Sequence, residues 1–255
     1  MIETLYWFGN SAKVRIIRDI LRTNPNAHVF DYGAGRGGDW DKILAANPGL
    51  KLTCYEPDDA SFADLEKKLS GKAALYTGGS IDTLAINADY IVSFSVFEHV
   101  ADRTAYLRHA KRCLAANGEF HLNYEDGHFR QFLNLSAALT WPGALVEHSR
   151  NLLAPLWLKL GKYGLYQKRV TPAAMTLLLQ ETGLTIASER YENLASLKTL
   201  AKTIAPEQKA AFATFWIEAE DALNSRFKTS TSPMNGDSTN LWREMPSRTL
   251  CLKHA

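Results

Sequence analysis

The chain has 255 residues, of which 46% are hydrophobic and 22% are charged, as in an ordinary globular protein. This length fits a single α/β domain with some insertions. The net charge of +2 is too small to indicate a nucleic-acid partner, although it does not exclude an anionic substrate.

The first half of the chain alternates short β-like runs with helical segments, which predicts a parallel sheet with crossover helices. We expect a helix over residues 12–21 and strands over 27–31, 51–55, 73–76, 90–94 and 119–124. Further helices are expected over 39–46, 61–69 and 103–114. Ser61 is a plausible cap of the second of these, and Asn117-Gly118 would end the third in a left-handed conformation.

The second half is less regular. A helix is expected from Pro172 to residue 182, ended by Gly183, and a strand over 184–191. Residues 194–224 read as two helices broken at Pro206, and residues 248–253 as a final strand. Leucines recur at helical spacing within 141–166, which favours an amphipathic helix packed on the core. A lid over a substrate and a surface that touches lipid are the alternatives.

A glycine-rich turn follows the first predicted strand. Gly33, Gly35 and Gly38 satisfy the G-x-G-x-x-G pattern, and Glu56 ends the next strand. Such a turn brings backbone N–H groups close to a ligand, and the later carboxylate can accept hydrogen bonds from two ribose hydroxyls. The pattern indicates an adenosine ligand, but alone it does not distinguish NAD from S-adenosylmethionine.

Asp31, just before the first glycine, favours one of these ligands. A carboxylate there would attract the ammonium group of an amino acid but repel a pyrophosphate at close range. S-adenosylmethionine carries the first group and NAD the second. The sequence also lacks the Tyr-x-x-x-Lys pair of many oxidoreductases.

In several segments, taken in order, the sequence resembles the class I S-adenosylmethionine-dependent methyltransferases, especially the small-molecule group of types 11 and 12. The matching segments are residues 29–37, 55–57, 89–100, 114–120 and 171–184, within a region of about 25–190. The resemblance implies a Rossmann-like, doubly wound sheet of seven mostly parallel strands with an antiparallel last strand. Helical insertions would form a cap.

The resemblance also implies which residues bind S-adenosylmethionine. Asp31 and the turn from Gly33 to Gly37 would hold the methionine portion, and Glu56 the ribose. The other contacts would be near adenine or along the cofactor's far side. The full implied set is Asp31, Gly33, Ala34, Gly35, Gly37, Glu56, Pro57, Ser80, Ile81, Phe94 and Ser95. An acidic residue is common at the Ser80 position, which makes this adenine contact atypical.

Two polar clusters follow predicted strands and are candidates for chemistry. In the first, His99 could deprotonate an acceptor while Glu98 orients it, or the pair could only fasten the loop. In the second, His128 or Asp126 could act as base and Tyr124 could contact the acceptor, or the polar loop could serve only as a turn. Some related enzymes hold a divalent cation with a Glu-x-x-Glu-His cluster. Here Ser95 replaces the first Glu, and no bound metal is expected at that cluster.

The remaining features predict location and partners. Cys54, Cys113 and Cys251 show neither CxxC nor Cys/His spacing, so we expect reduced thiols, no metal and a cytoplasmic setting. No apolar run is long enough to cross a bilayer, and residues 1–10 do not resemble a signal peptide. Peripheral membrane contact is not expected, and the chain would be a monomer or homodimer.

These observations predict a single methyltransferase domain over 1–255. It would comprise an N-terminal helix (1–25), an acceptor-covering insertion (127–170) and a helical insertion before the last strand (192–245). We expect methyl transfer from S-adenosylmethionine to a small molecule, with O-methylation of a sugar or secondary metabolite as the first hypothesis. An NAD-dependent oxidoreductase and a non-catalytic cofactor-binding protein are the alternatives. Nucleic-acid methylation is disfavoured because no basic stripe with interleaved aromatics is present.

Overall fold

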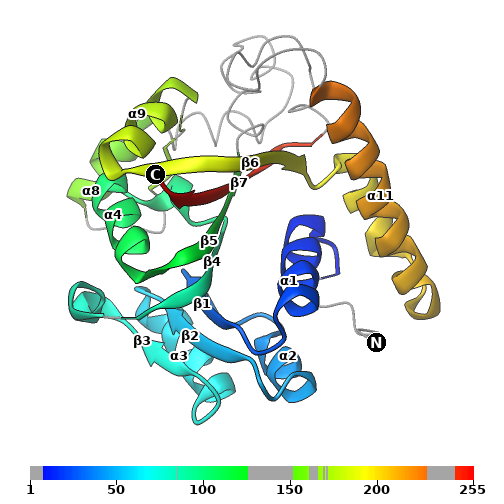
Figure 1. Ribbon diagram of the computed structural model, residues 1–255, viewed down its shortest axis with the longest axis horizontal. Coiled ribbons are helices and arrows are strands. Elements are labelled where there is room, and N and C mark those ends of the chain that lie inside the picture. The colour runs from blue at the N-terminus through cyan, green and yellow to red at the C-terminus, as the bar shows by residue number, and fades with distance from the viewer. Residues whose placement is uncertain are drawn as a thin grey trace.

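The computed structural model describes residues 8–84, 86–125, 152–160, 166–168, 170, 172–228 and 245–255. These residues form a seven-stranded sheet in the order β3-β2-β1-β4-β5-β7-β6 (Figure 1). Every strand runs in one direction except β7, which is antiparallel to β5 and β6. The predicted fold class is therefore confirmed. The strands are β1 (His28–Tyr32), β2 (Lys51–Tyr55), β3 (Ala74–Tyr76), β4 (Ala88–Phe94), β5 (Leu114–Glu125), β6 (Leu184–Glu192) and β7 (Ser247–His254).

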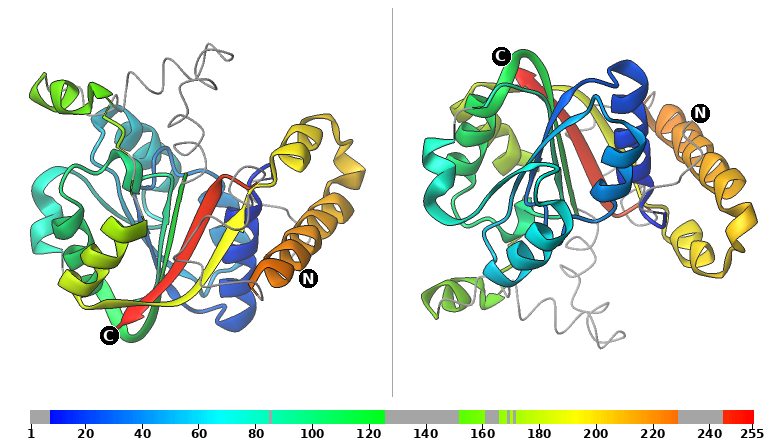
Figure 2. Two further views of the ribbon diagram at one scale, coloured as in Figure 1. Left: turned by 90° about the horizontal axis from the view of Figure 1, so that it is seen from above. Right: turned by 90° about the horizontal axis from the view of Figure 1, so that it is seen from below.

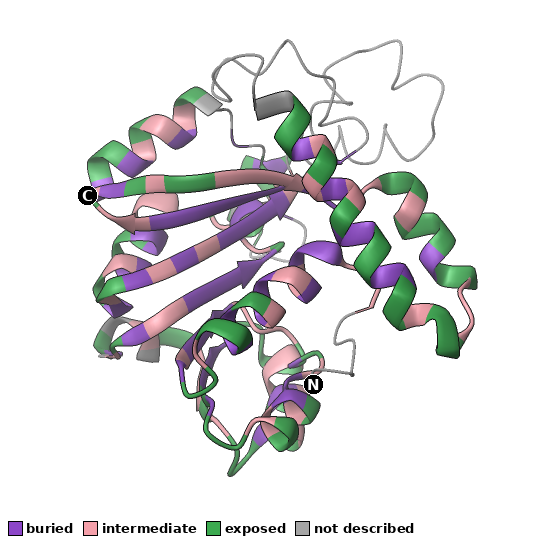
Figure 3. Ribbon diagram, turned by 45° about the vertical axis from the view of Figure 1, so that its right-hand side comes forward, coloured by how far each residue is buried: buried purple, intermediate pink, exposed green. Residues whose placement is uncertain are grey.

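Helices cover both faces of the sheet, as Figure 2 shows in two views. One hydrophobic cluster joins α1 (Ser11–Thr23), α2 (Trp40–Ala46) and α3 (Asp59–Leu69) to one face. A second cluster joins α4 (Arg103–Cys113) and α9 (Pro172–Thr182) to the other. Because both faces are covered, the central strands are buried along most of their length (Figure 3).

The alternation of side chains along β1 decides where its polar residue points. Val29 packs in the cluster under α1 and α2, whereas Phe30 and Tyr32 pack in the cluster under α4. Because successive side chains of a strand point to opposite faces, Asp31 faces α1 and α2. The sequence pattern therefore places a carboxylate between two helices, next to the glycine-rich turn.

Helices lie between β6 and β7 in the chain. They comprise α10 (Ala195–Leu200), two short 3-10 turns (Ala201–Thr203 and Pro206–Gln208) and α11 (Lys209–Lys228). Phe212 and Trp216 of α11 form a small separate core with Ala201. The long helix also contacts α1, where Ser11 Oγ donates a hydrogen bond of 2.9 Å to Glu220.

Two predicted helix ends are wrong. The cap of α3 is Asp58, whose side chain accepts from the N–H of Ser61, so the helix starts two residues earlier than expected. The helix α4 ends at Cys113, and the extended backbone of Leu114 leads directly into β5. Gly118 thus lies within β5, where a Cβ would come within 2.8 Å of the Leu114 side chain. Close packing explains this glycine better than a left-handed turn.

The leucine-rich segment is described only in part. Within it, α8 (Ala154–Lys159) is a short helix. Its neighbourhood does not show the predicted packing on the core, because the large apolar side chains there are exposed: Leu152, Leu153, Leu156 and Leu160. No helix in the described ranges has the length and apolar character needed to span a membrane.

Candidate functional site

The glycine-rich turn is docked on the carboxyl end of β2. The N–H groups of Gly33 and Ala34 both donate to the carbonyl of Tyr55, at 2.9 and 3.0 Å. Gly33 has a φ of +95°, and a Cβ there would lie 2.4 Å from Val96, in the loop after β4. The turn is therefore held between two strand ends, at the edge of the sheet where α/β proteins bind ligands.

The backbone at Gly35 is open to a ligand. Its φ is +55°, and a Cβ built there would meet no atom within 4 Å. Gly37, by contrast, has a φ of +79° and approaches Leu65 of α3, where a Cβ would lie 2.9 Å from the leucine side chain. The two glycines thus serve different needs: Gly35 leaves space beside the turn, and Gly37 lets the turn pack on α3.

Glu56 faces the turn from the end of β2. Its Oε2 accepts the N–H of Gly35 at 2.7 Å, and its Oε1 accepts the N–H of Asp58 at 2.9 Å. Burial raises the pKa of this carboxyl, and the two N–H donors act in the opposite direction. The carboxylate is thus fixed beside the open backbone of Gly35, while the next residue, Pro57, is exposed.

Asp31 is buried on the opposite side of the turn. Its Oδ2 accepts the indole N–H of Trp40 at 2.6 Å. Burial raises the pKa of Asp31 to about 6, although the Trp40 hydrogen bond and the charge of Lys13 both favour the ionised form. A buried carboxylate that accepts a short hydrogen bond on one oxygen is suited to receive a cationic group.

Lys13 is a charged residue at this site that the sequence reasoning missed. It lies on α1, and its ammonium group is 5.1 Å from the centroid of the Phe94 ring at the end of β4. Burial lowers the pKa of Lys13, while the carboxylates of Asp31 and Asp39 oppose that shift. Its signal in the sequence is a lysine in the first turn of the helix that precedes the glycine motif.

The end of β4 and the segment after β3 complete this edge. Ser95 has a φ of +56°, unusual for a residue with a side chain, and its N–H donates to the carbonyl of Asn123 at 2.9 Å. The backbone at Ser80 belongs to a 3-10 helix (Gly78–Thr83), anchored where Tyr55 donates from its hydroxyl to the Gly78 carbonyl. Ile81 of the same helix is partly buried against the core under α4.

Comparison with known proteins assigns this arrangement. Residues 30–120, which contain the glycine-rich turn, Glu56 and Ser95, match the family model of a methyltransferase domain. The fold resembles that of a protein from Galdieria sulphuraria, with a TM-score of 0.51 and 15% identity. The function given for that protein, sarcosine dimethylglycine methyltransferase, is itself inferred. That alignment covers 93% of this chain and 83% of the other. Residues 30–120 therefore carry a methyltransferase domain, and the sheet has the Rossmann-like fold of the S-adenosylmethionine-dependent methyltransferases.

Two other solved structures share the fold of this methyltransferase. Geranyl diphosphate C-methyltransferase from Streptomyces coelicolor, solved with Mg²⁺, geranyl diphosphate and S-adenosyl-L-homocysteine, aligns with a TM-score of 0.53 and 10% identity over 95% of this chain and 80% of that one. A methyltransferase in complex with the Trm112 activator of Haloferax volcanii aligns with a TM-score of 0.50 and 13% identity over 99% of each chain. No curated protein sequence matches the chain. The oxidoreductase and non-catalytic alternatives are therefore set aside.

His99 of the methyltransferase is exposed, four residues beyond Ser95, in the 3-10 turn η2 (Phe97–His99). Its Nδ1 lies 2.8 Å from the carbonyl oxygen of Tyr166. Since a carbonyl oxygen only accepts hydrogen bonds, Nδ1 carries the proton and the neutral ring has its lone pair on Nε2. The hypothesis that Glu98 orients His99 is therefore wrong: a backbone carbonyl does so.

Glu98 has a different environment from its neighbour. It is buried, which raises the pKa of its carboxyl to about 7; the nearby charge of Glu125 adds to the shift, and Arg103 opposes it. Its Oε2 has no hydrogen-bond partner among the described residues. Its backbone carbonyl accepts the N–H of Lys168 at 2.9 Å, and Arg103 bonds the Lys168 carbonyl. The turn is thus fastened to residues 166–168.

Of the second predicted cluster, the structure describes Tyr124. Tyr124 is buried, and its hydroxyl accepts a hydrogen bond of 2.9 Å from Arg248. Tyr124 is still within β5, which continues to Glu125, and its ring packs in the hydrophobic cluster under α4. The side chain therefore belongs to the core and does not face an acceptor. His128 lies outside the described residues.

Proposed function

We propose that the methyltransferase transfers a methyl group to a hydroxyl of a small acceptor, with His99 as the base. The observation that carries this proposal is the fixed orientation of His99 beside the carboxyl end of β4. The Tyr166 carbonyl holds the proton on Nδ1, which leaves Nε2 able to accept a proton from an acceptor hydroxyl. The sugar or secondary-metabolite class of the acceptor stays a hypothesis from the sequence.

The residues at the sheet edge suit the charges of S-adenosylmethionine. Asp31 would receive the ammonium group of the methionine portion, and Lys13 would receive its carboxylate. Glu56 would accept hydrogen bonds from the ribose hydroxyls, and the open backbone at Gly35 would border the same ligand. Ser80 and Ile81 remain the proposed neighbours of adenine, with Phe94 and Ser95 on the other side.

The protein has little covalent chemistry to perform. S-adenosylmethionine supplies an activated methyl group on its sulfonium sulfur. The chain must then align the acceptor, exclude water and remove the hydroxyl proton. His99 would take that proton on Nε2 and later release it to solvent. The backbone carbonyl of Glu98 would help to hold the turn that carries His99.

Turnover of His99→Ala tests this role. With labelled S-adenosylmethionine and a panel of hydroxylated acceptors, we expect a loss of about 10²–10⁴-fold in kcat with nearly unchanged cofactor affinity, because only proton removal is affected. His254→Ala is a matched control, since His254 lies at the far end of β7 and contacts the Leu114 carbonyl. His128→Ala tests the other candidate base. Wild-type turnover in His99→Ala would remove His99 from the mechanism.

A further inference from the structure

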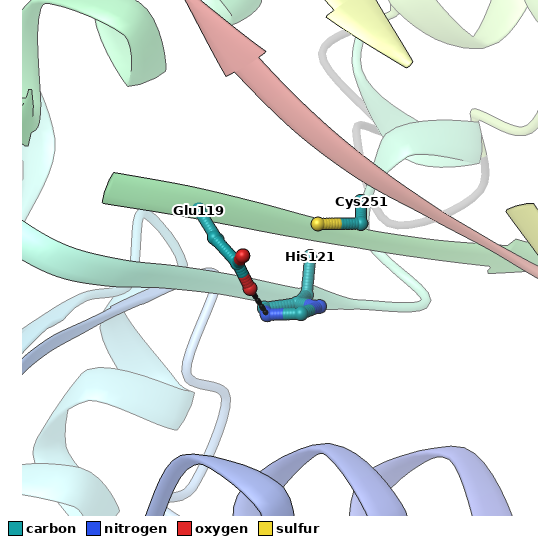
Figure 4. Close-up of side chains that lie close together, drawn as sticks. All are labelled: Glu119, His121 and Cys251. Atoms are coloured by element: carbon teal, nitrogen blue, oxygen red, sulfur yellow. Dashed lines mark ion pairs between the residues drawn. The ribbon is translucent and has the colours of Figure 1, made fainter. Parts of the chain in front are cut away.

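A group of metal-ligand side chains lies on the sheet away from the cofactor edge. Glu119 and His121 of β5 and Cys251 of β7 each offer a ligand atom, and these atoms all lie within 4.8 Å of one another. Figure 4 shows the carboxylate and the imidazole side by side on one strand, with the thiol reaching over from the other. We propose that Glu119, His121 and Cys251 form a zinc site.

The strands fix these positions. His121 and Cys251 are direct partners in the antiparallel pairing of β5 with β7, and Glu119 is two residues before His121. Residues two apart on a strand share a face, as do direct cross-strand partners. The three side chains therefore come together on paired strands, and no loop has to change conformation before a metal binds.

The distances suit a tetrahedral ion. The Nε2 of His121 and the Oε2 of Glu119 are 3.3 Å apart. Two ligands at the usual zinc distances of about 2.0–2.2 Å and a tetrahedral angle would be separated by roughly 3.3–3.6 Å. One nitrogen, one sulfur and one oxygen form a donor set that favours zinc over magnesium or calcium, which prefer oxygen alone.

Neighbouring groups support the ligands from outside. Lys253 binds the other oxygen of Glu119 at 3.0 Å, which leaves Oε2 directed at His121. The ring of Tyr90 lies roughly parallel to the ring of His121, with 6.3 Å between the centroids. Such outer contacts orient the ligands of a metal site. Glu119 and His121 are partly exposed, so water can supply the fourth ligand.

This site is separate from methyl transfer. Glu119 is six residue steps along β5 from the strand's carboxyl end at Glu125, a distance of about 20 Å at 3.3 Å per residue. An ion here would join β5 to β7 and thus stabilise the antiparallel part of the sheet. On binding, the Cys251 thiol loses its proton to solvent, and the thiolate forms the metal–sulfur bond.

Cobalt titration of the purified full chain tests the proposal, because Co²⁺ bound to a thiolate shows a charge-transfer absorption in the near ultraviolet. We expect one Co²⁺ per chain with this absorption, displaced by Zn²⁺. Cys251→Ser should lose the absorption, and both Cys251→Ser and Glu119→Gln should weaken Zn²⁺ binding at least tenfold.

Cys113→Ser is the matched control. Cys113 Sγ lies 3.5 Å from His109 Nε2, so it forms a second Cys–His pair, but one without a carboxylate ligand. This variant should keep the absorption. Circular dichroism shows whether Cys251→Ser folds. If it does not fold, Glu119→Gln provides the test, because Glu119 is partly exposed and its replacement is less disruptive. A wild-type chain without the charge-transfer absorption, or a Cys251→Ser or Glu119→Gln variant that binds Zn²⁺ as tightly as wild type, would overturn the proposal.

Discussion

Asp31 and Lys13 form a pair of opposite charges at the site, each largely removed from water. The carboxylate lies under Trp40, and the ammonium group lies over Phe94. A ligand with one positive and one negative group can satisfy both residues, whereas a pyrophosphate can satisfy only Lys13. The charge argument from the sequence rested on Asp31 alone, and the structure adds its counterpart.

The affinity for S-adenosylmethionine should fall as the pH falls from 7 to 5. The pKa of Asp31 is about 6 in the free protein, mainly because of burial, so the carboxyl is mostly protonated at pH 5. A bound ammonium group would lower that pKa, and binding would therefore release a proton. We expect about a tenfold weaker affinity at pH 5 than at pH 7, measured by calorimetry.

Asp31→Asn is the control for this assignment. It removes the titrating group and should flatten the profile between pH 5 and 7. A profile that keeps its full slope in Asp31→Asn would assign the effect to another carboxyl of this site, such as Glu56, whose pKa burial also raises.

At the scale of elements, the glycine turn and the loop after β4 depend on each other. Gly33 has a positive φ and faces Val96, whereas Gly35 also has a positive φ but faces open space. Alanine at Gly35 would therefore add backbone strain alone, whereas alanine at Gly33 would add backbone strain and steric overlap.

Gly33→Ala should lower the free energy of unfolding by more than Gly35→Ala. Both replacements strain the backbone by about 1–2 kcal/mol, but only the first places a Cβ 2.4 Å from a Val96 carbon. We expect Gly35→Ala to weaken cofactor binding with a small loss of stability, and Gly33→Ala to do both. Urea unfolding and calorimetry measure the two effects, and equal stabilities for the two variants would contradict the overlap.

The sequence predicted most elements because their signals are local. Short apolar runs defined β1, β2 and β4, and Pro172 and Gly183 bounded α9. The end of α4 was wrong because Asn117-Gly118 has the composition of a helix cap, while cross-strand packing against Ala88 draws these residues into β5. Similarly, the Glu98 hypothesis failed because the partner of His99, the carbonyl of Tyr166, is 67 residues away in sequence.

At the scale of the whole molecule, a polar network joins α1 to three strands of the sheet. Glu192 of β6 is buried and binds Arg15 of α1 at 2.5 Å as well as Thr249 of β7. The Thr249 hydroxyl in turn accepts from the Asn123 side chain of β5 at 2.8 Å. No periodicity reveals such a network, because its members come from four distant segments.

Glu192→Ala should lower the free energy of unfolding by about 3 kcal/mol, because it leaves the mostly buried Arg15 charge without its main partner. Asp64→Ala is the matched control: its pair with Arg36 spans 3.5 Å between exposed side chains, and removing it should change stability by less than about 1 kcal/mol. Urea unfolding followed by circular dichroism compares the two. Equal, small losses would show that the network contributes little.

Calorimetric titration at pH 7.5 tests the central claim, that the charge pair at the sheet edge selects S-adenosylmethionine. Wild-type protein should bind one S-adenosylmethionine per chain and show no measurable heat with NAD⁺. Asp31→Asn and Lys13→Met should each weaken S-adenosylmethionine binding about tenfold, which corresponds to roughly 1.4 kcal/mol, while Arg22→Met, an exposed change on the same helix, should leave it unchanged. Undiminished affinity in both Asp31→Asn and Lys13→Met, or tighter binding of NAD⁺ by the wild type, would contradict the account.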